Sequence, residues 1–293
     1  MQIRKLDDKC DRCGRCVKDC AAGVWRDIDG EPTPVAPQLC NLCSHCLAVC
    51  PRNAIEHDLL DKAQVRSITK DLINPDAYRE IVMTRRSVRH YKKKPVPRET
   101  IEAILDLARY SPTASNAQNV QYTIVTNMDL MRRVSKRIFG LGKRANKWLT
   151  SKRGKLLLKA FEKTDFGKSF GRYISVMDYY KDQTEAGRDY ILHNAPVLIL
   201  IHAPSRANFA CDNCNIAAAN ITNYAHALGL ATCYLGFITM FLRFDRTMRS
   251  WFDIPKGQRV FASLVLGYPL YSHTFSVSRN RPTARWIAGN DSE

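Results

Sequence analysis

The sequence predicts an α+β fold, in which helices surround a mixed β-sheet, preceded by a small cysteine-rich domain. Eight of the eleven cysteines lie within the first fifty residues. From about residue 78 onward, helical apolar patterns alternate with short apolar runs that are typical of strands. A chain of 293 residues is long enough for one small and one large domain.

The N-terminal cysteines form two copies of one motif. Cys10-x2-Cys13-x2-Cys16-x3-Cys20 is followed by Cys40-x2-Cys43-x2-Cys46-x3-Cys50. In this spacing a tight loop delivers three thiolates to one iron–sulfur cluster, while the fourth cysteine of each run reaches the other cluster. Two zinc sites of four cysteines each are the alternative. A reducing compartment would keep these thiols free of disulfides, and we therefore expect a cytoplasmic protein.

Residues 1–60 resemble bacterial two-[4Fe–4S] ferredoxins. The resemblance implies that Cys10, Cys13, Cys16 and Cys50 bind one cluster, and that Cys40, Cys43, Cys46 and Cys20 bind the second. Ala21 departs from the pattern, because this family usually has proline after the fourth cysteine. A domain of this size has a small core, so we expect the clusters to hold it together.

The elements of the large domain follow in order after a polar linker at residues 61–77. Residues 98–110 place apolar side chains on one helical face, and residues 213–228 form a second helix that ends at Gly229. Short apolar runs predict strands at residues 122–126, 197–202 and 262–266. We expect the large domain to span residues 78–293, interrupted by a basic, partly helical insertion at about residues 140–190.

Several short motifs follow one another through the large domain. They are Thr84-Arg85-Arg86-Ser87-Val88-Arg89, Ser111-Pro112-Thr113-Ala114-Ser115-Asn116, Gly229-Leu230-Ala231-Thr232-Cys233-Tyr234-Leu235-Gly236, Gly267-Tyr268-Pro269 and Arg279-Asn280-Arg281-Pro282. Each motif is weak by itself, but the ordered set is similar to the nitroreductase family of FMN-binding enzymes across residues 78–290, apart from the insertion.

The resemblance implies roles for these residues. In this family the first motif binds the FMN phosphate and ribityl groups, here through Arg85, Arg86, Ser87 and Arg89, and arginine forks suit a phosphate dianion. Arg279 and Arg281 would complete the phosphate site. Pro112, Thr113 and Asn116 match a loop that contacts the flavin of the partner protomer, so we expect a homodimer. Leu235 and Gly236 match the backbone segment at flavin N5.

The net charge of +17 is concentrated in one part of the chain. Residues 131–172 carry 14 basic and 2 acidic side chains, whereas residues 1–70 are nearly neutral. A solvated surface is the plain interpretation, and a lid that attracts an acidic donor protein or an anionic substrate is the sharper one. Charge without a recognised motif does not predict nucleic-acid binding. We expect no membrane span, because the longest apolar run covers only residues 195–203.

The combination predicts an oxidoreductase in which an external donor, with reduced ferredoxin favoured, loads two clusters that pass electrons to FMN. A small electrophile would then be reduced, such as a nitroaromatic, a quinone or an enone. The alternatives are an electron-transfer component without its own substrate and an iron–sulfur redox sensor. The sequence names no catalytic acid. For Cys211 and Cys214 a role in packing is favoured over a redox or metal role. Four histidines of the large domain are expected to be structural, at positions 90, 193, 202 and 226.

Overall fold

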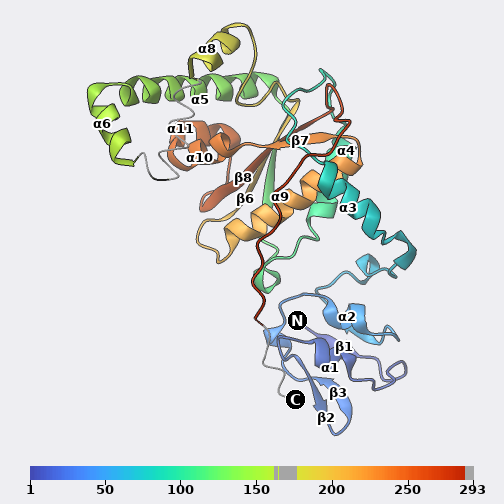
Figure 1. The fold of residues 1–293 in the computed structure, drawn as a ribbon. Coiled ribbons are helices and arrows are strands. Elements are labelled where there is room, and N and C mark those ends of the chain that lie inside the picture. Colours follow the sequence, from blue (N-terminus) through green and yellow to red (C-terminus); the bar gives the residue numbers. More distant parts are fainter. Residues whose placement is uncertain (162–163, 165–176, 288–293) are drawn as a thin grey trace.

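The computed structural model describes residues 1–161, 164 and 177–287 (Figure 1). The cysteine-rich part consists of two antiparallel strand pairs and two short helices. Its strand β1 (Ile3–Lys5) pairs with β4 (Ile55–His57), and β2 (Trp25–Ile28) pairs with β3 (Glu31–Pro34). The helices are α1 (Arg15–Asp19) and α2 (His45–Val49), with the 3-10 turn η1 (Pro37–Leu39) between the two halves. A small buried cluster holds these elements together: Ile3, Val24, Trp25, Leu47 and Ile55.

The sequence repeat is also a repeat of backbone conformation. Gly14 and Ser44 precede α1 and α2 with φ of 68° and 62°, and Arg12 and Leu42 occupy the same left-handed region two residues earlier. Left-handed backbone is rare for residues other than glycine, so its recurrence at equivalent positions shows that each loop imposes the same turn. The two cysteine loops are therefore structural copies.

An exposed connector leads from the cysteine-rich part to the larger part of the chain. It contains two single 3-10 turns, η2 (Lys62–Gln64) and η3 (Lys70–Leu72). Helix α3 (Pro75–Thr84) then begins with Asn74 as its N-cap, because the Asn74 Oδ1 accepts hydrogen bonds from the backbone N–H groups of residues 76 and 77. Proline at the first helical position fits this start.

A four-stranded sheet in the order β5-β6-β8-β7 forms the centre of the larger part. The strands are β5 (Gln121–Val125), β6 (Val197–Pro204), β7 (Ala231–Tyr234) and β8 (Gln258–Gly267), and neighbouring strands pair antiparallel. A parallel element comes from the isolated bridge between Ser87 and Thr232. The α+β prediction is confirmed, as are the three predicted strands. The sequence analysis missed β7, which lies within a motif that had been assigned to cofactor contact.

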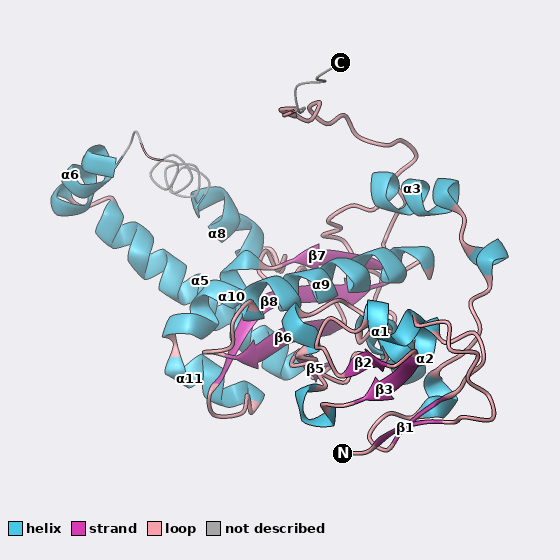
Figure 2. Cartoon of the chain, turned by 90° about the horizontal axis from the view of Figure 1, so that it is seen from below, coloured by secondary structure: helices cyan, strands magenta, loops and turns pink. Residues whose placement is uncertain are grey.

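Helices cover both faces of the sheet, and β6 shows why. Val197, Ile199 and Ile201 face the layer of α4 (Arg98–Ala108) and α9 (Ala210–Ala227), whereas Leu198 and Leu200 face the opposite layer. All five side chains are fully buried or nearly so. A strand buried on both faces has a continuous apolar sequence, which explains why this run was recognisable. Figure 2 shows the helices on either side of the strands.

The opposite layer contains α5 (Met128–Leu149) and α10 (Gly236–Phe244), followed by α11 (Arg246–Arg249) and the 3-10 turn η5 (Ser250–Phe252). Helix α5 continues through α6 (Lys152–Phe161), and α8 (Met177–Glu185) returns towards the sheet. The segment predicted as a basic insertion is therefore helical in parts, and the helix that leads into it begins at residue 128. Residues 162–163 and 165–176 of this segment lie outside the described residues.

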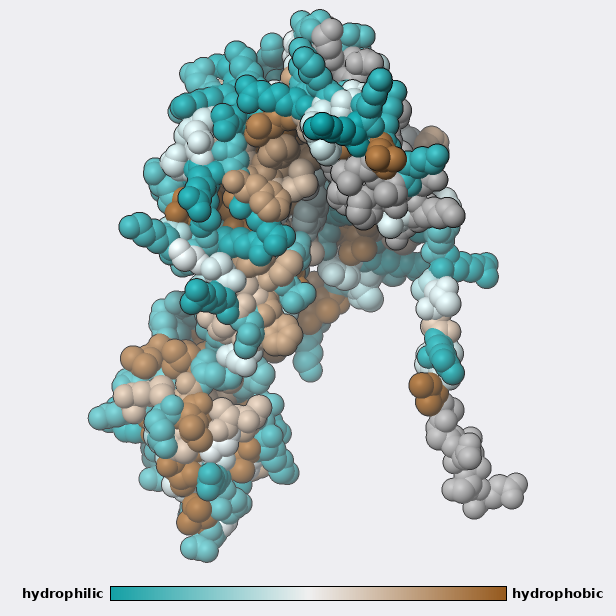
Figure 3. Space-filling view, turned by 90° about the vertical axis from the view of Figure 1, so that its left-hand side faces the viewer, coloured by the Kyte–Doolittle hydropathy of each residue, from teal (hydrophilic) through white to brown (hydrophobic). Residues whose placement is uncertain are grey.

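The basic helices and the cysteine-rich part lie at opposite ends of the molecule. Figure 1 places α6 at the upper left and α1 and α2 at the bottom, and Figure 2 separates them in the same way from a perpendicular direction. Figure 3 looks onto the end that carries α6, where hydrophilic side chains cover much of the upper part. A partner bound to α6 would therefore not lie beside the cysteines.

Residues 270–287 form an exposed C-terminal segment without helix or strand. It carries three strongly exposed apolar side chains, namely Phe275, Trp286 and Ile287. In Figure 3 this segment projects from the body as a separate thread. Among the described residues, no helix combines the length and the apolar character that crossing a membrane requires.

Candidate functional site

Four cysteines from the two ends of the repeat surround one small cavity. Cys10, Cys13 and Cys16 line it together with Cys50. Burial, with a smaller contribution from the neighbouring thiols of Cys10 and Cys50, raises the pKa of the Cys16 thiol to about 11. The cavity thus joins three cysteines of the first loop to the last cysteine of the second loop, which is the combination expected for the first cluster. Iron would favour the thiolate form against this burial.

The second set of cysteines is gathered in the same manner. Burial raises the pKa of the Cys46 thiol, and the thiols of Cys40 and Cys43 contribute because they lie nearby. Cys20 packs against the same small core as Cys40, Cys46 and Cys50. No described group of three or more His, Cys, Asp or Glu side chains converges closely enough to hold one metal ion. A four-iron cluster needs a more widely spaced ligand set than a single ion does.

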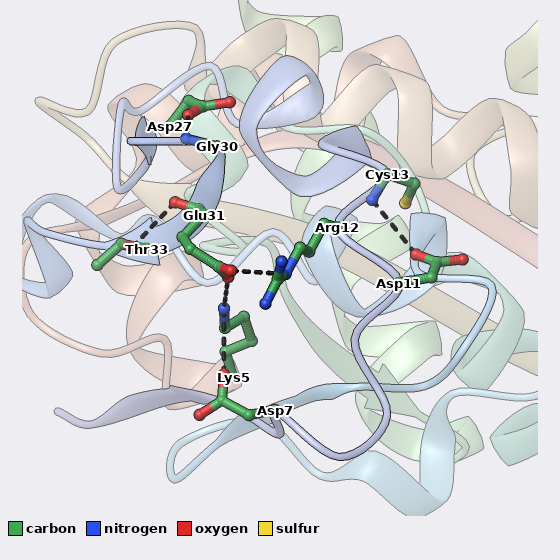
Figure 4. Close-up of polar contacts among 9 residues, drawn as sticks. All are labelled: Lys5, Asp7, Asp11, Arg12, Cys13, Asp27, Gly30, Glu31 and Thr33. Atoms are coloured by element: carbon green, nitrogen blue, oxygen red, sulfur yellow. Dashed lines mark hydrogen bonds and ion pairs between the residues drawn. The ribbon is translucent and has the colours of Figure 1, made fainter.

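Polar contacts fix the first cysteine loop to the strands (Figure 4). The Glu31 carboxylate bridges Lys5 of β1 and Arg12 of the loop. The hydrogen bond from Lys5 holds the pKa of Glu31 below its ordinary value, and the Arg12 charge adds to this effect. The backbone N–H of Cys13 donates to Asp11 Oδ1 at 3.3 Å, and Asp11 pairs with Arg52 from the second half. Thus charges at the rim hold the two halves in register.

Two contacts accompany the second set of cysteines. His57 Nε2 lies 3.5 Å from the Sγ of Cys40, and its Nδ1 accepts a hydrogen bond from the backbone N–H of Leu59 at 3.1 Å. The His57 side chain has no exposed surface. The sequence analysis did not single out His57, although its place at the end of β4 next to a cysteine repeat was a usable signal.

Three arginines converge on the start of the larger part without a described counter-charge. Burial lowers the pKa of Arg86, and the positive charges of Arg279 and Arg85 lower it further. The Arg86 Nε–H is buried and has no hydrogen-bond partner among the described residues. Such a group is costly unless an anion is bound, so this set fits a phosphate. The fold thus brings together sequence positions almost two hundred residues apart.

The backbone of the first motif runs beside β7. Ser87 forms a bridge with Thr232, and the Val88 N–H donates to the Thr232 carbonyl at 3.0 Å. Burial raises the pKa values of Cys233 and Tyr234, and the positive charge of Arg85 opposes part of this rise. The buried Thr232 hydroxyl has no partner among the described residues. Thr232 is therefore a polar group of this site that the sequence analysis missed.

A cavity of about 390 Å³ opens where β7 meets α10. It is lined by Leu235 and Gly236 together with polar and aromatic side chains from α10 and β8. The Leu235 N–H donates to the Ser263 carbonyl at 2.9 Å, which fixes the turn into α10. A Cβ placed on Gly236 would meet no atom within 4 Å. The protein's own packing leaves this space open, as a closely approaching ligand would require.

The loop that contains Pro112, Thr113 and Asn116 is held by α9. Asn213, which is 2% exposed, accepts a hydrogen bond from the Ala114 N–H at 3.1 Å, and Asn220 donates to the Ser111 hydroxyl at 2.9 Å. Thr113 Oγ1 accepts from the Gln118 N–H. The structure gives this loop no contact with the arginine set within the described part of one chain. The sequence analysis missed Asn213 and Asn220, because neither belongs to one of the short motifs and their contacts are with residues about one hundred positions away.

Asn116 instead makes a contact with the cysteine-rich part. Its Nδ2 donates to the backbone carbonyl of Asn41 at 2.9 Å, and Asn41 follows the cluster-ligand candidate Cys40. The other predicted flavin residues lie at the surface near the first motif or beyond it. Arg89 and Arg281 are exposed, and within the described residues no hydrogen bond or ion pair joins Arg281 to the arginine set.

Of the remaining candidates, Cys214, His202 and His226 are involved in packing. Cys211 is exposed, whereas burial raises the pKa of Cys214 to about 12, which opposes formation of a reactive thiolate. His202 lies between Thr123 and Gln258 inside the sheet, and His226 contacts the Thr84 hydroxyl at 2.9 Å. These contacts support the structural roles expected for both histidines.

Comparisons with known proteins agree with this geometry. The family model described as the nitroreductase family matches residues 82–268, and a 4Fe-4S dicluster domain model matches residues 9–55. A protein from Methanothermobacter thermautotrophicus, provisionally named an NADH dehydrogenase/NAD(P)H nitroreductase, is 25% identical over 65% of this chain and 76% of its own length. A protein of the same name from Archaeoglobus fulgidus is 25% identical over 65% of this chain and 84% of its own.

Solved structures show the same fold. A nitroreductase with bound FMN from Bacteroides fragilis has a TM-score of 0.54 at 20% identity, covering 74% of this chain and all of that one. An iodotyrosine deiodinase with bound FMN and 3-iodo-L-tyrosine has a TM-score of 0.52 at 18% identity, covering 72% and 99%. The family match spans more than half of the sequence, and the chain therefore belongs to the nitroreductase family of oxidoreductases, with a 4Fe–4S domain at its N-terminal end.

Proposed function

We propose that this protein is an iron–sulfur flavoprotein oxidoreductase that carries electrons from an external donor through two [4Fe–4S] clusters to FMN, for reduction of a small electrophile. The observation that carries the proposal is the hydrogen bond from Asn116 to Asn41, because it joins the second cysteine loop to a loop of the nitroreductase part. Clusters transfer single electrons, and a bound flavin supplies conversion between one-electron and two-electron steps.

The cysteine geometry supports two clusters with exchanged ligands. The cavity formed by Cys10, Cys13, Cys16 and Cys50 joins the two halves of the repeat, and the second loop repeats the backbone turns of the first. Cys20 would complete the second set with Cys40, Cys43 and Cys46. The chain's contribution is to shield most of these sulfurs partly from solvent, to hold both loops through Glu31 and Asp11, and to present the second loop towards Asn116.

The arginine set supports FMN. Arg86, Arg85 and Arg279 would bind the phosphate, and the unpaired Arg86 Nε–H gives that phosphate a buried donor. Ser87 and Arg89 extend the set along the edge of β7, and Arg281 would reach it from the C-terminal segment. Leu235 and Gly236 leave room for the ring system beside the cavity of about 390 Å³. That volume lies within the usual range for small-molecule sites.

A second copy of the chain fits the remaining observations. The C-terminal segment exposes Phe275, Trp286 and Ile287, and α3 exposes Tyr78 and Val82. Large exposed apolar side chains on an extended segment are typical of a surface that a partner covers. Pro112, Thr113 and Asn116 lie apart from the arginine set of their own chain. In a homodimer this loop would instead serve the flavin of the partner protomer.

Reduced ferredoxin is the donor we favour, because its low potential matches that of such clusters. The names of the archaeal relatives point to a nicotinamide donor instead. The donor is therefore the first quantity to measure. The protein, loaded with iron, sulfide and FMN, is mixed anaerobically with reduced ferredoxin or with NADH and NADPH. We expect rapid bleaching with ferredoxin, and rapid turnover with NADH but no response to ferredoxin would contradict this route.

The substrate is tested in the same apparatus. Protein reduced by its donor is mixed with a nitroaromatic, a quinone, an enone and an organohalide, and reoxidation is followed at the flavin absorbance. Stoichiometric reoxidation by one of these compounds supports an enzyme with its own substrate. Reoxidation only by a protein partner, with none of the panel reacting, would contradict the enzyme and support an electron-transfer component.

A further inference from the structure

We infer that His57 is a positioning residue for the second cluster, and that its Nε2–H donates a hydrogen bond to the ligand Sγ of Cys40, so that this cluster is reduced more easily than the first. The inference rests on the proposed function, because it assumes a cluster at Cys40, Cys43, Cys46 and Cys20. It adds a difference in reduction potential between the two clusters, which neither the sequence repeat nor the family match implies.

The position of His57 is set by the backbone. Strand β4 pairs with β1 in a register that places His57 opposite Ile3, and this pairing directs the ring into the small core. The side chain has no exposed surface, and its Nε2 lies 3.5 Å from the Cys40 Sγ. Sulfur is a large acceptor, so this separation is a hydrogen-bonding distance.

The second ring nitrogen determines which atom carries the proton. The Leu59 backbone N–H donates to His57 Nδ1 at 3.1 Å, and a nitrogen that accepts a hydrogen bond has no proton of its own. The Asp58 carboxylate, at 3.7 Å from Nδ1, is beyond hydrogen-bond distance. In the neutral ring the proton is therefore on Nε2, which faces the sulfur. The Leu59 amide orients the donor, as outer partners commonly do at metal sites.

The repeat supplies an internal comparison. Residue 27 occupies the position equivalent to His57 in the first half, and it is an exposed aspartate whose carboxylate accepts from the Gly30 N–H. Both sets receive a backbone hydrogen bond on sulfur, because the Leu42 N–H donates to Cys40 of the second set and the Ala54 N–H donates to Cys50 of the first set. His57 therefore adds a side-chain donor to one set, and no described side chain does the same for Cys10.

A donor to a ligand sulfur changes the reduction potential. Reduction adds one electron to the cluster and transfers no proton from His57, so the added negative charge is partly stabilised by the N–H dipole. The effect raises the potential of the second cluster relative to the first. Because Asn41 of the same loop contacts Asn116, the more easily reduced cluster is the one that adjoins the nitroreductase part. Electrons that enter at the first cluster would then move downhill towards the flavin.

The test is an anaerobic redox titration of the reconstituted full chain, followed by the electron paramagnetic resonance signals of both reduced clusters. His57→Phe keeps a planar ring without a donor, and His57→Gln keeps an N–H donor. His45→Gln is the matched control, because His45 is exposed and its ring contacts Asp19 instead of a sulfur. We expect His57→Phe to weaken electron binding at one cluster by about tenfold, a shift of ~59 mV, while the other cluster is unchanged. His57→Gln should restore part of that shift.

Identical potentials in wild type and His57→Phe, with iron and sulfide content unchanged, would overturn the inference. A second measurement needs no variant. In wild-type protein labelled with ¹⁵N-histidine, pulsed electron–nuclear spectroscopy should detect hyperfine coupling from one histidine nitrogen to a reduced cluster. Absence of that coupling would also overturn it. Failure of the proposed function is distinguishable, because it would appear as a low iron count or as clusters that do not reduce the flavin, whatever the effect of His57.

Discussion

Asn116 Nδ2 and the backbone carbonyl of Asn41 lie 2.9 Å apart, and this hydrogen bond connects the nitroreductase part to the second cysteine loop. Asn116 has φ of 52°, a left-handed conformation that asparagine tolerates better than most residues do. The side chain is therefore held in place by a backbone turn that α9 supports through Asn213. In the proposed route, electrons cross from the cysteine-rich part to the nitroreductase part at this contact.

Replacement of Asn116 tests that passage. Asn116→Gly keeps the left-handed backbone and removes the side chain, so we expect slower electron transfer from the reduced clusters to FMN, by about tenfold, with unchanged iron content. Stopped-flow absorbance at the flavin band provides the measurement. Gln118→Gly is the matched control, since Gln118 is exposed in the same loop with φ of 45°. Equal rates for both variants and wild type would show that the contact does not carry the transfer.

Loss of Arg86 should weaken FMN binding more than it weakens the fold. Arg86→Met removes a guanidinium whose Nη1 and Nη2 donate to the backbone carbonyls of Arg85 and Met83, and whose buried Nε–H has no described protein partner. We therefore expect a Kd for FMN about 100-fold higher, a difference of about 2.7 kcal/mol. Arg86→Lys keeps the positive charge but loses the forked guanidinium, so its Kd for FMN should lie between those of wild type and Arg86→Met. Quenching of flavin fluorescence gives the Kd. A variant that binds FMN as tightly as wild type would remove Arg86 from the phosphate site.

Gly236→Ala separates ligand contact from protein packing. A Cβ at this position meets no protein atom within 4 Å, and the backbone φ there is not left-handed, so we expect the midpoint of thermal unfolding without FMN to stay within about 1 °C. The added methyl group would enter the space reserved for the flavin and weaken FMN binding by about tenfold. Gly267→Ala is the contrasting variant, because its Cβ would meet Pro196 at 2.6 Å and destabilise the apoprotein. Unchanged FMN affinity in Gly236→Ala would place the flavin elsewhere.

The pH dependence of stability should include a contribution from His193. Burial, assisted by the charges of Arg89 and His90, lowers the pKa of His193 to about 4. The unfolded chain, with a histidine pKa of about 6.5, binds the proton more readily, so stability is complete above that pH and is lost as the pH falls towards 4. Between pH 7 and pH 5.5 we expect the free energy of unfolding to fall by about 1 kcal/mol. His193→Asn should remove it, since His193 has φ of 57° and asparagine accepts that backbone.

Denaturant unfolding at the two pH values checks this prediction. The free energy of unfolding of His193→Asn should differ between pH 7 and pH 5.5 by about 1 kcal/mol less than that of wild type. His273→Asn, at an exposed position of the C-terminal segment, is the control. If wild type and His193→Asn lost equal free energy over this interval, His193 would not be held neutral by burial.

Charge reversal on α5 and α6 tests the role of the basic end. The helices lie at the opposite end of the molecule from the cysteines (Figure 1), so reversal of Lys143, Arg144, Lys147 and Lys152 should leave reduction of the clusters by ferredoxin unchanged. The reversed charges should slow the reduction of an anionic substrate at low ionic strength, where the electrostatic attraction acts. At high ionic strength the rates should converge, because salt screens this attraction. A large, salt-sensitive fall in the rate of cluster reduction would place the donor on this surface.

The parts of the fold that the sequence predicted share a strong local signal. Residues 197–202 are continuously apolar because β6 is buried on both faces, and the helix that ends before Gly229 has a regular apolar face. Strand β7 has no such signal, because it is four residues long and its burial comes from pairing with β8. Helix α5 was not predicted, because its first turns pack into the sheet's core, whereas the sequence analysis described this region by its charge.

The candidate sites follow the same division. Cysteine spacing is local, so all eight ligand candidates were predicted, and the structure gathers four of them around one cavity. The residues that support the sites contact residues far away in the sequence. For this reason no local motif indicates the roles of Thr232, Asn213 and His57. Arg86 and Arg279 were found through the order of the motifs, but only the fold shows that their charges meet.

Rapid mixing tests the central claim most directly. The protein, loaded with about eight irons per chain and with FMN, is mixed with reduced ferredoxin, and frozen samples are examined by electron paramagnetic resonance while absorbance reports the flavin. The account predicts that both cluster signals rise before the flavin band bleaches, and that Cys43→Ala, which removes a ligand of the second cluster, abolishes the later phase. Bleaching of the flavin at the same rate in Cys43→Ala would contradict the route through the clusters.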